Sequence, residues 1–433
     1  ALTALYAWAA GLAGRKIRMP RPSAAGDNRT ATIILAAIIL CAFLLRSYQL
    51  GDVSVRFDHY ESDYAREALR LLNGNHNVSL WNSINWRGLG HLNYSPIYIY
   101  LVTLFFYVFG ISLVTLKMVA VFWGITAVLL AYGIVKTLFG SRLALLTAFL
   151  FAVSPLHINY SRIGLLLCST LTVSLLMVYF LLRAILHNKK GAFVLLGITV
   201  CFAGYFYSPA KYPILLSAVL LILFIIFRRC FLKSRWPGIV LMLITIFLIT
   251  LGFNIPTLEL IAPSFADYES VWHRTREHQY TPQADYERAI PLIRENIEKL
   301  IESIFLKRNF NYNPWPRGNL YFNPVVPVLA VIGLFFSLAN LKKVNYCLLL
   351  FFTAAFLIPN LLSRPPVMVR RMMVSWPFIY CLTAIPLSQL IMKGKQLLPR
   401  TAGIIISALV ILFLLGIGSY NSYVFFKSRQ PAG

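Results

Sequence analysis

The sequence predicts an all-α polytopic membrane protein with about eleven (11–13) transmembrane helices. Hydrophobic residues make up 58% of the 433-residue chain and charged residues only 13%, whereas a soluble domain is about one quarter charged. Apolar runs recur along the whole chain, and each is long enough at ~1.5 Å per residue to cross ~30 Å of hydrocarbon. Because these runs are continuous rather than alternating, they exclude a membrane β-barrel.

Short clusters of basic residues set the orientation of the predicted helices. Residues 15–29 hold five arginines and lysines ahead of the first apolar run at 31–50, which places the N-terminal segment in the cytoplasm and residue 51 outside. Five further basic loops are assigned to the cytoplasm: Lys136/Arg142, His187–Lys190, Arg228–Arg235, Lys342/Lys343 and Lys393–Arg400. The remaining spans are then expected at 112–138, 143–160, 165–186, 191–207, 212–228, 237–256, 324–341, 344–362, 371–392 and 402–422. Much of the +25 net charge falls in these clusters, so we expect no binding to nucleic acid.

The segment 94–110 is apolar enough to span the bilayer, but we predict that it lies at the outer surface. A span here would move every later basic loop to the outside, against the positive-inside rule. Seven of its residues are Tyr or Phe, and aromatic side chains favour the membrane interface.

This threading divides the chain into four parts. A basic cytoplasmic segment occupies residues 1–30. A seven-span catalytic module follows at 31–256 and includes the exterior loop 51–111. A long exterior loop covers 257–323, and a four-span module occupies 324–433.

The carboxylates are concentrated outside the predicted spans. Fourteen of the fifteen lie at 52–67 and 259–302, one stretch in each exterior loop, and each loop is expected to carry an amphipathic helix. A transporter usually needs charge inside its spans to move ions. The distribution therefore favours chemistry at the outer membrane surface.

The first exterior loop contains a predicted amphipathic helix that starts near Ser62 and stops at Asn73-Gly74. Its apolar face is expected to comprise Ala65, Ala68, Leu69 and Leu72, with Asp63 and Glu67 on a solvated face. Asp58 and Glu61 stand at the junction of loop and helix, near the positive end of the helix dipole. They serve there either as helix caps or as site residues.

This arrangement resembles the GT-C glycosyltransferases, which include the protein O-mannosyltransferases and the lipid A aminoarabinose transferases. The resemblance rests on a carboxylate-bearing helix after the first span, followed by an aromatic segment around Pro96-Ile97-Tyr98. Glu61, Tyr64-Ala65, Leu71-Leu72 and Gly74 match the family pattern. Tyr60 stands where the family has Asp, and Asp58 lies two residues earlier, so the resemblance leaves open which carboxylate is catalytic.

Further matches lie at the predicted outer ends of later spans. They are Ser161-Arg162, the segment Tyr207-Ser-Pro-Ala-Lys211-Tyr-Pro213, and the run from Arg364 to Arg370-Arg371. Positive-inside logic disfavours cations at these positions. They either pair with exterior acids and lipid phosphates or form a phosphate cradle, because Arg offers bidentate contacts and Lys a point charge. We predict that Lys211, Arg162, Arg370 and Arg371 bind the donor phosphate.

The remaining candidate residues are aromatic or histidine side chains near these positions. Tyr64, Tyr207 and His59 are predicted to contact substrate. No cofactor is assigned. A divalent metal stays open as an alternative, with Asp58 and His59 as its candidate ligands.

These observations predict an inverting membrane glycosyltransferase, a hexosyl- or pentosyltransferase of the type that the resemblance implies. The sugar would pass from a polyprenyl-phosphate donor to a lipid, glycan or protein acceptor, with Asp58 or Glu61 as general base. The expected location is the cell (inner) membrane of a bacterium or archaeon, with the site on the exterior face of the cell envelope. Two alternatives stay open: a lipid-linked glycan flippase or transporter, and an enzyme of the O-antigen ligase or polymerase type.

Overall fold

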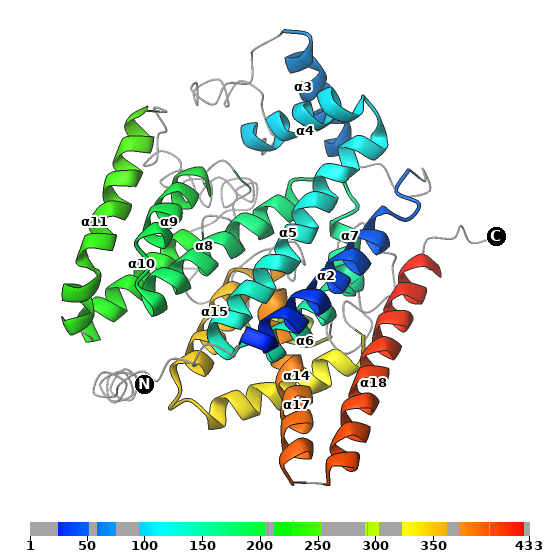
Figure 1. The fold of residues 1–433 in the computed structure, drawn as a ribbon. Coiled ribbons are helices and arrows are strands. Elements are labelled where there is room, and N and C mark those ends of the chain that lie inside the picture. Colours follow the sequence, from blue (N-terminus) through cyan, green and yellow to red (C-terminus); the bar gives the residue numbers. More distant parts are fainter. Residues whose placement is uncertain are drawn as a thin grey trace. The chain divides into compact units, whose positions relative to one another are not determined.

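The computed structural model describes residues 25–51, 59–74, 95–203, 206, 212–227, 229–252, 291, 293–302, 323–361, 372–397 and 399–427. Within these ranges every regular element is a helix (Figure 1). The eleven helices that correspond to predicted spans are α2 (Ala25–Ser47), α5 (Leu113–Phe139), α6 (Ser141–Ala152), α8 (Leu167–His187), α9 (Lys190–Ala203), α10 (Tyr212–Phe227), α11 (Arg229–Gly252), α14 (Val325–Ala339), α15 (Val344–Leu361), α17 (Trp376–Leu397) and α18 (Arg400–Lys427). The all-α polytopic architecture is therefore confirmed.

Six helical stretches of the described residues are long and apolar enough to cross a membrane unaided. They are Arg29–Ser47, Leu113–Phe139, Leu167–His187, Ser234–Leu251, Met373–Gly394 and Thr401–Tyr423. Large apolar side chains such as Ile33, Phe247 and Leu412 are 62%, 63% and 63% exposed on them, which in water would be costly. The chain is an integral membrane protein.

The predicted span 143–160 is not continuous. Helix α6 ends at Ala152, and a separate short helix, α7, covers Pro155–Tyr160. The Ser154 hydroxyl accepts a hydrogen bond from the backbone N–H of His157 at 3.3 Å, and Pro155 occupies the first turn of α7. Because Pro lacks an N–H and disfavours helical backbone in the residue before it, the chain restarts here as a new helix.

The structure confirms that the two predicted non-spanning segments are helical. Helix α3 covers His59–Leu72 and α4 covers Pro96–Phe109. At ~1.5 Å per residue, the 14 residues of α4 reach about 21 Å. One face of α4 is buried, while Tyr107 on the other is 80% exposed.

The chain folds into two compact units that do not follow its linear order. Among the described residues, the first unit combines those within 58–120 and 164–288, and the second those within 20–57, 121–163 and 289–433. Helix α5 begins in the first unit and continues into the second at residue 121.

In the first unit, α9 packs against α8 and α11, and α10 against the same two helices (Figure 1, green). The Nδ2 of Asn188 donates to the Ser234 carbonyl at 3.2 Å, and Nε of Arg235 donates to the Ile185 carbonyl at 2.9 Å. These bonds hold the basic loop at 187–190 against the start of α11. The loop predicted at Arg228–Arg235 is wrong from residue 229 on, because α11 already begins at Arg229. The assignment of residues 187–190 and 228–235 to one side of the membrane is consistent with these bonds.

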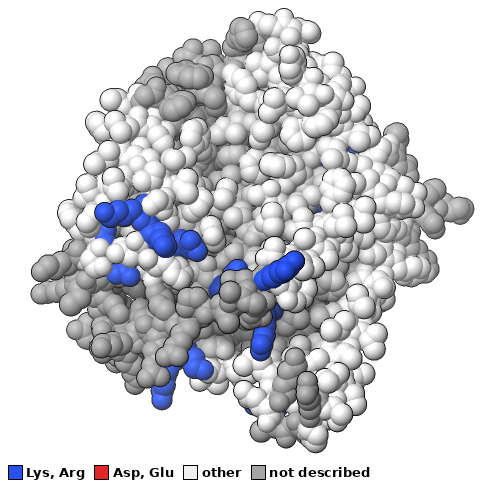
Figure 2. Space-filling view, viewed as in Figure 1, with Lys and Arg blue, Asp and Glu red and all other residues white. Residues whose placement is uncertain are grey.

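In the second unit, α17 packs against α14, α6 and α18, and α2 packs against α6. The Nδ2 of Asn345 donates to the Leu138 carbonyl at 3.3 Å, and the rings of Phe139 and Tyr346 are 5.0 Å apart. The basic loops at 136–142 and 342–343 therefore also lie at one end of their unit. On the face drawn in Figure 2, the charged side chains of the described residues are all Lys or Arg.

Candidate active site

The acid-bearing helix α3 buries one stripe of side chains against α4. Its buried residues include Glu61, Tyr64, Ala68 and Leu71, whose spacing of three and four residues places them on one helix face. The predicted face shared only Ala68 with this stripe, because sequence reasoning counted aliphatic residues and Tyr64 makes the main contact. The stripe brings Glu61 and Tyr64, two of the predicted site residues, to the same surface.

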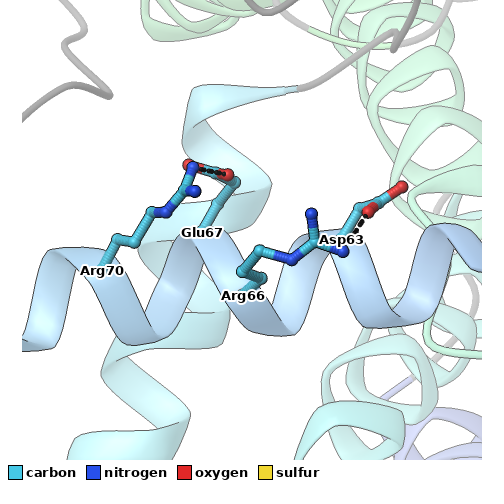
Figure 3. A network of polar contacts seen from close by, with 4 residues as sticks. All are labelled: Asp63, Arg66, Glu67 and Arg70. Atoms are coloured by element: carbon cyan, nitrogen blue, oxygen red, sulfur yellow. Dashed lines mark hydrogen bonds and ion pairs between the residues drawn. The ribbon is translucent and has the colours of Figure 1, made fainter.

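Two other carboxylates on α3 are paired with arginines of the same helix (Figure 3). Asp63 Oδ1 is 2.9 Å from Nη2 of Arg66, and Glu67 Oε1 is 2.6 Å from Nη1 of Arg70. The expected solvated position is wrong for Glu67, which is only 3% exposed. Its pairing with Arg70 reduces the cost of burying the carboxylate.

Glu61 makes its hydrogen bond to a different part of the chain. It is 0% exposed, and its Oε1 accepts the backbone N–H of Gly164 at 2.6 Å. A Cβ atom at position 164 would lie 2.9 Å from Cγ of Leu116 and 3.0 Å from Oε1 of Glu61. Glycine is thus the residue that lets the backbone come this close to the carboxylate. A short bond from an N–H to a carboxylate is charge-assisted and fixes the orientation of Glu61.

Tyr64 links this carboxylate to the first turn of α4. Its ring lies edge-on to that of Tyr98, with centroids 5.1 Å apart and an angle of 69° between the planes. Tyr98 is 0% exposed. Burial raises the pKa of the Tyr98 hydroxyl well above its ordinary value, and the nearby Tyr64, Glu61 and Cys168 add to that rise. The Tyr98 hydroxyl therefore stays protonated.

Most of the predicted site residues lie outside the described residues. These are Asp58, Tyr207, Lys211, Arg370 and Arg371. His59 is the first residue of α3, but its side chain is also outside the described part. Among the side chains that the structure does describe, no three of His, Cys, Asp and Glu are grouped to hold a metal ion. The predicted roles of Asp58 and His59, including the open metal site, stay predictions.

Arg162, the fourth predicted ligand of the donor phosphate, lies in the second unit and is 1% exposed. Its guanidinium donates hydrogen bonds of 2.5–3.2 Å to the carbonyls of Leu45, Arg46, Tyr48 and Gln49. It also lies 5.6 and 5.7 Å from the rings of Phe425 and Phe426. Carbonyls at a helix C-terminus attract cations, so Arg162 caps the end of α2. Its role as a phosphate ligand stays a prediction.

Sequence reasoning missed three buried polar residues. Arg46 is 0% exposed and donates to the carbonyls of Ala42 and Ala152 at 2.9 and 3.0 Å and to Nδ1 of His157 at 2.9 Å. Lys117, 1% exposed on α5, and Tyr98 are the other two. The sequence did give a reason to single out Arg46 and Lys117, since each is a cation inside a predicted span. Tyr98 had none beyond its position in an aromatic segment.

The comparisons with known proteins agree with this architecture. The family model described as dolichyl-phosphate-mannose-protein mannosyltransferase matches residues 93–252. A comparison with curated protein sequences finds no match.

Solved structures of two proteins have similar folds. The Archaeoglobus fulgidus oligosaccharyltransferase tethered to an acceptor peptide has a TM-score of 0.55 at 14% identity, with 92% of this chain and 55% of that chain covered. The same protein, AglB, in complex with an inhibitory peptide and a dolichol-phosphate gives 0.55 at 14%, covering 94% and 56%. ArnT from Cupriavidus metallidurans in the apo state gives 0.52 at 12%, covering 94% and 74%.

The chain spans about half the length of the archaeal oligosaccharyltransferase chains. At such low identity the structural matches establish the fold, and the family match covers the stretch from the aromatic segment to the end of α11. The structural matches therefore give the chain the GT-C fold, and residues 93–252 resemble the protein-mannosyltransferase family.

Proposed function

We propose that the protein is an inverting glycosyltransferase that moves a sugar from a polyprenyl-phosphate donor to a lipid, glycan or protein acceptor at the exterior face of the membrane. The observation that carries the proposal is a buried carboxylate, Glu61, held on a helix directly after the first span of a GT-C fold. The structurally similar archaeal oligosaccharyltransferase has been captured with a dolichol-phosphate and with an acceptor peptide. These ligands belong to the donor and acceptor classes proposed for this chain.

The proposed reaction is a single displacement at the anomeric carbon of the sugar. The acceptor hydroxyl gives its proton to Asp58 or Glu61 as general base while its oxygen attacks the anomeric carbon. The bond from that carbon to the phosphate oxygen breaks, and the polyprenyl phosphate leaves with the electron pair. Attack opposite the leaving group inverts the configuration. An acceptor that is already ionised, such as a phosphate, needs no base, and the carboxylate then only orients it.

The departing phosphate gains negative charge and requires cations beside it. Lys211, Arg370 and Arg371 are the proposed ligands, with Arg162 as a fourth candidate. Arg suits a bidentate contact to phosphate and Lys a point contact. A divalent metal held by Asp58 and His59 would supply the same stabilisation by charge.

The decisive experiment is transfer by Glu61→Gln and Asp58→Asn variants, measured with purified protein and lipid-linked sugars. General-base assistance contributes roughly 10²–10⁴-fold, so the variant lacking the base should lose that factor. The Gln side chain keeps an oxygen that can accept the Gly164 N–H, so the melting temperature should change little. The matched control is Asp63→Asn, which removes a carboxylate that is paired with Arg66 on the same helix. This variant should keep its turnover. If both amide variants retain more than about one tenth of wild-type turnover, neither carboxylate is the base.

The exterior location is tested separately by thiol labelling in intact cells. Single cysteines at Ser79 and Ser303 should react with an impermeant reagent, and one at Asn188 should not, because 187–190 belongs to the basic cytoplasmic loops. Labelling at 188 without labelling at 79 would place the site on the opposite face.

A further inference from the structure

The first unit contains a buried hydroxyl that has no hydrogen-bond partner among the residues that the structure describes. Tyr98 is 0% exposed, and its Oη has neither a donor nor an acceptor among the described residues. Buried hydroxyls in folded proteins are nearly always bonded, because leaving one unpaired costs stability. An exception next to a carboxylate is a feature to explain.

The hydroxyl cannot turn away to find a partner. The N-cap Ser95 accepts the backbone N–H of Tyr98 at 3.3 Å, and Pro96 fixes the first turn of α4. The ring is packed edge-on against Tyr64, which is itself only 5% exposed. The backbone and the ring of Tyr98 are therefore both fixed, and with them the position of the hydroxyl.

The surroundings of the ring do not need a hydroxyl. Further along α4, Phe106 fills a buried position on the same helix at 4% exposure without any polar atom. A phenylalanine at position 98 would make the same edge-on contact with Tyr64. Packing alone therefore does not account for the Tyr98 oxygen.

The position of the ring points to the substrate of the candidate active site. Tyr64 stands one turn after Glu61 on the buried stripe of α3, so its contact with Tyr98 brings α4 next to the Glu61 carboxylate. A neutral hydroxyl both donates and accepts hydrogen bonds, which is the chemistry that recognises a sugar hydroxyl. The Glu61 carboxylate and the Tyr64 ring beside it are further groups of the kind that bind a polyhydroxylated ligand.

We propose that Tyr98 is a substrate-binding residue whose Oη hydrogen-bonds a hydroxyl of the transferred sugar. This assignment rests on the proposed glycosyltransferase function and names the part of the donor that α4 recognises. Because the hydroxyl is closed off in the structure, sugar binding is coupled to a parting of α3 and α4.

The test compares Tyr98→Phe with Tyr107→Phe, which removes a hydroxyl from the exposed side of the same helix. Melting temperatures are measured without ligand, with a polyprenyl phosphate, and with polyprenyl-phosphate mannose, glucose, galactose and arabinose. Transfer kinetics are measured with each sugar lipid that the wild-type protein uses.

Tyr98→Phe should melt at the wild-type temperature or up to about 2 °C above it, because it removes an unpaired buried hydroxyl. It should keep the stabilisation by polyprenyl phosphate and lose part of the additional stabilisation by the sugar lipid. The KM for the sugar lipid should rise about tenfold, equivalent to ~1.4 kcal/mol. Tyr107→Phe should match the wild type throughout.

Two results would overturn the assignment alone. One is a Tyr98→Phe protein that melts well below Tyr107→Phe, since the hydroxyl would then have a structural partner. The other is sugar-lipid affinity and KM within twofold of the wild type. If the wild-type protein itself transfers none of the four sugars, the proposed function is rejected for these donors and the Tyr98 assignment is rejected with it.

Discussion

Two buried charged centres, one in each unit, have opposite signs and are neutralised by opposite ends of the peptide dipole. In the first unit the Glu61 carboxylate accepts a backbone N–H from Gly164. In the second unit Arg46 and Arg162 donate to backbone carbonyls at the ends of α2 and α6. In a chain with 13% charged residues, the backbone supplies partners that side chains supply elsewhere.

The two centres differ in the number and kind of groups that surround the buried charge. Arg162 makes hydrogen bonds to four carbonyls and is flanked by two aromatic rings. This is the environment of a residue that holds a helix end in place. Glu61 is contacted by a glycine amide at a point where a side chain would not fit, and it lies next to tyrosines that suit a ligand. The surroundings of Glu61 are therefore those of a binding site, whereas the surroundings of Arg162 are those of a residue that stabilises the fold, here called the Arg162 clamp.

Arg162→Leu tests the clamp and has the largest expected effect. It leaves four carbonyls near the end of α2 without their donor, and each unsatisfied buried group costs about 1–3 kcal/mol. We expect a loss of more than ~3 kcal/mol of stability, seen as a melting temperature lower by at least about 6 °C in detergent. Arg162→Lys, which keeps the charge but fewer directed donors, should fall between this variant and the wild type.

The control is Arg142→Leu, an exposed arginine at the start of α6, which should melt with the wild type. A different result would support the donor-phosphate role of Arg162. In that case Arg162→Leu would keep its melting temperature and lose only its affinity for polyprenyl phosphate.

Gly333→Ala examines how tightly the second unit is packed around its helices. A Cβ at this position of α14 would lie 1.9 Å from the backbone oxygen of Leu382 on α17, so the two helices must separate. Overpacking of this kind costs roughly 1–3 kcal/mol, which exceeds the ~1 kcal/mol that Ala gains over Gly in a helix. Thermal unfolding in detergent measures the loss.

Gly416→Ala provides the matched control, because a Cβ there meets nothing within 4 Å. It should leave α18 unchanged or slightly more stable. Equal melting temperatures for the two alanine variants would contradict the close approach of α14 and α17.

Gly164→Ala disturbs the Glu61 centre without removing any polar atom. The new Cβ would lie 3.0 Å from Oε1 of Glu61 and 2.9 Å from Cγ of Leu116, so the carboxylate must shift. We expect a cost of about 1 kcal/mol in stability and a larger loss in turnover, because a displacement of ~1 Å in a site can lower the rate by about 100-fold.

Gly191→Ala, at the start of α9, meets nothing within 4 Å and should behave as the wild type in both assays. Full turnover in Gly164→Ala would show that the position of Glu61 is not critical to the reaction.

Arg66→Gln should have the smallest effect of the four. It breaks the ion pair with Asp63, in which the Arg66 side chain is 58% exposed. Such exposed pairs contribute only about 0–1 kcal/mol, so stability and transfer should both stay close to the wild type. A marked loss of transfer would mean that the paired face of α3 also contacts substrate, and that Glu61 is not the only functional carboxylate of this helix.

The sequence allowed the spans to be predicted because each is a continuous apolar run with polar ends. The span expected at 165–186 corresponds to Leu167–His187, and that at 112–138 to Leu113–Phe139. The break at Ser154-Pro155 was missed because a proline at the first turn of a helix is compatible with a long apolar run. Local spacing also placed Glu61 and Tyr64 on one helix.

The partners of these two residues could not be predicted. The Gly164 amide is 103 residues from Glu61, and Tyr98 is on another helix. Such contacts depend on how α3, α4 and the segment before α8 pack, which no local pattern encodes. Likewise, Arg162 was recognised as a cation that needs a partner, but the backbone carbonyls that bind it have no signature in the sequence.

The pairing of Val153 with Asn421 has a consequence for biosynthesis. The Nδ2 of Asn421 donates to the Val153 carbonyl at 3.1 Å across 268 residues, next to the place where Phe425 and Phe426 flank Arg162. At ribosomal speeds of about 5–20 residues per second, on the order of tens of seconds separate the synthesis of Val153 from that of Asn421. During that interval the early helices are in the membrane without the last one. Until Asn421 has been synthesised, the Val153 carbonyl lacks this amide donor.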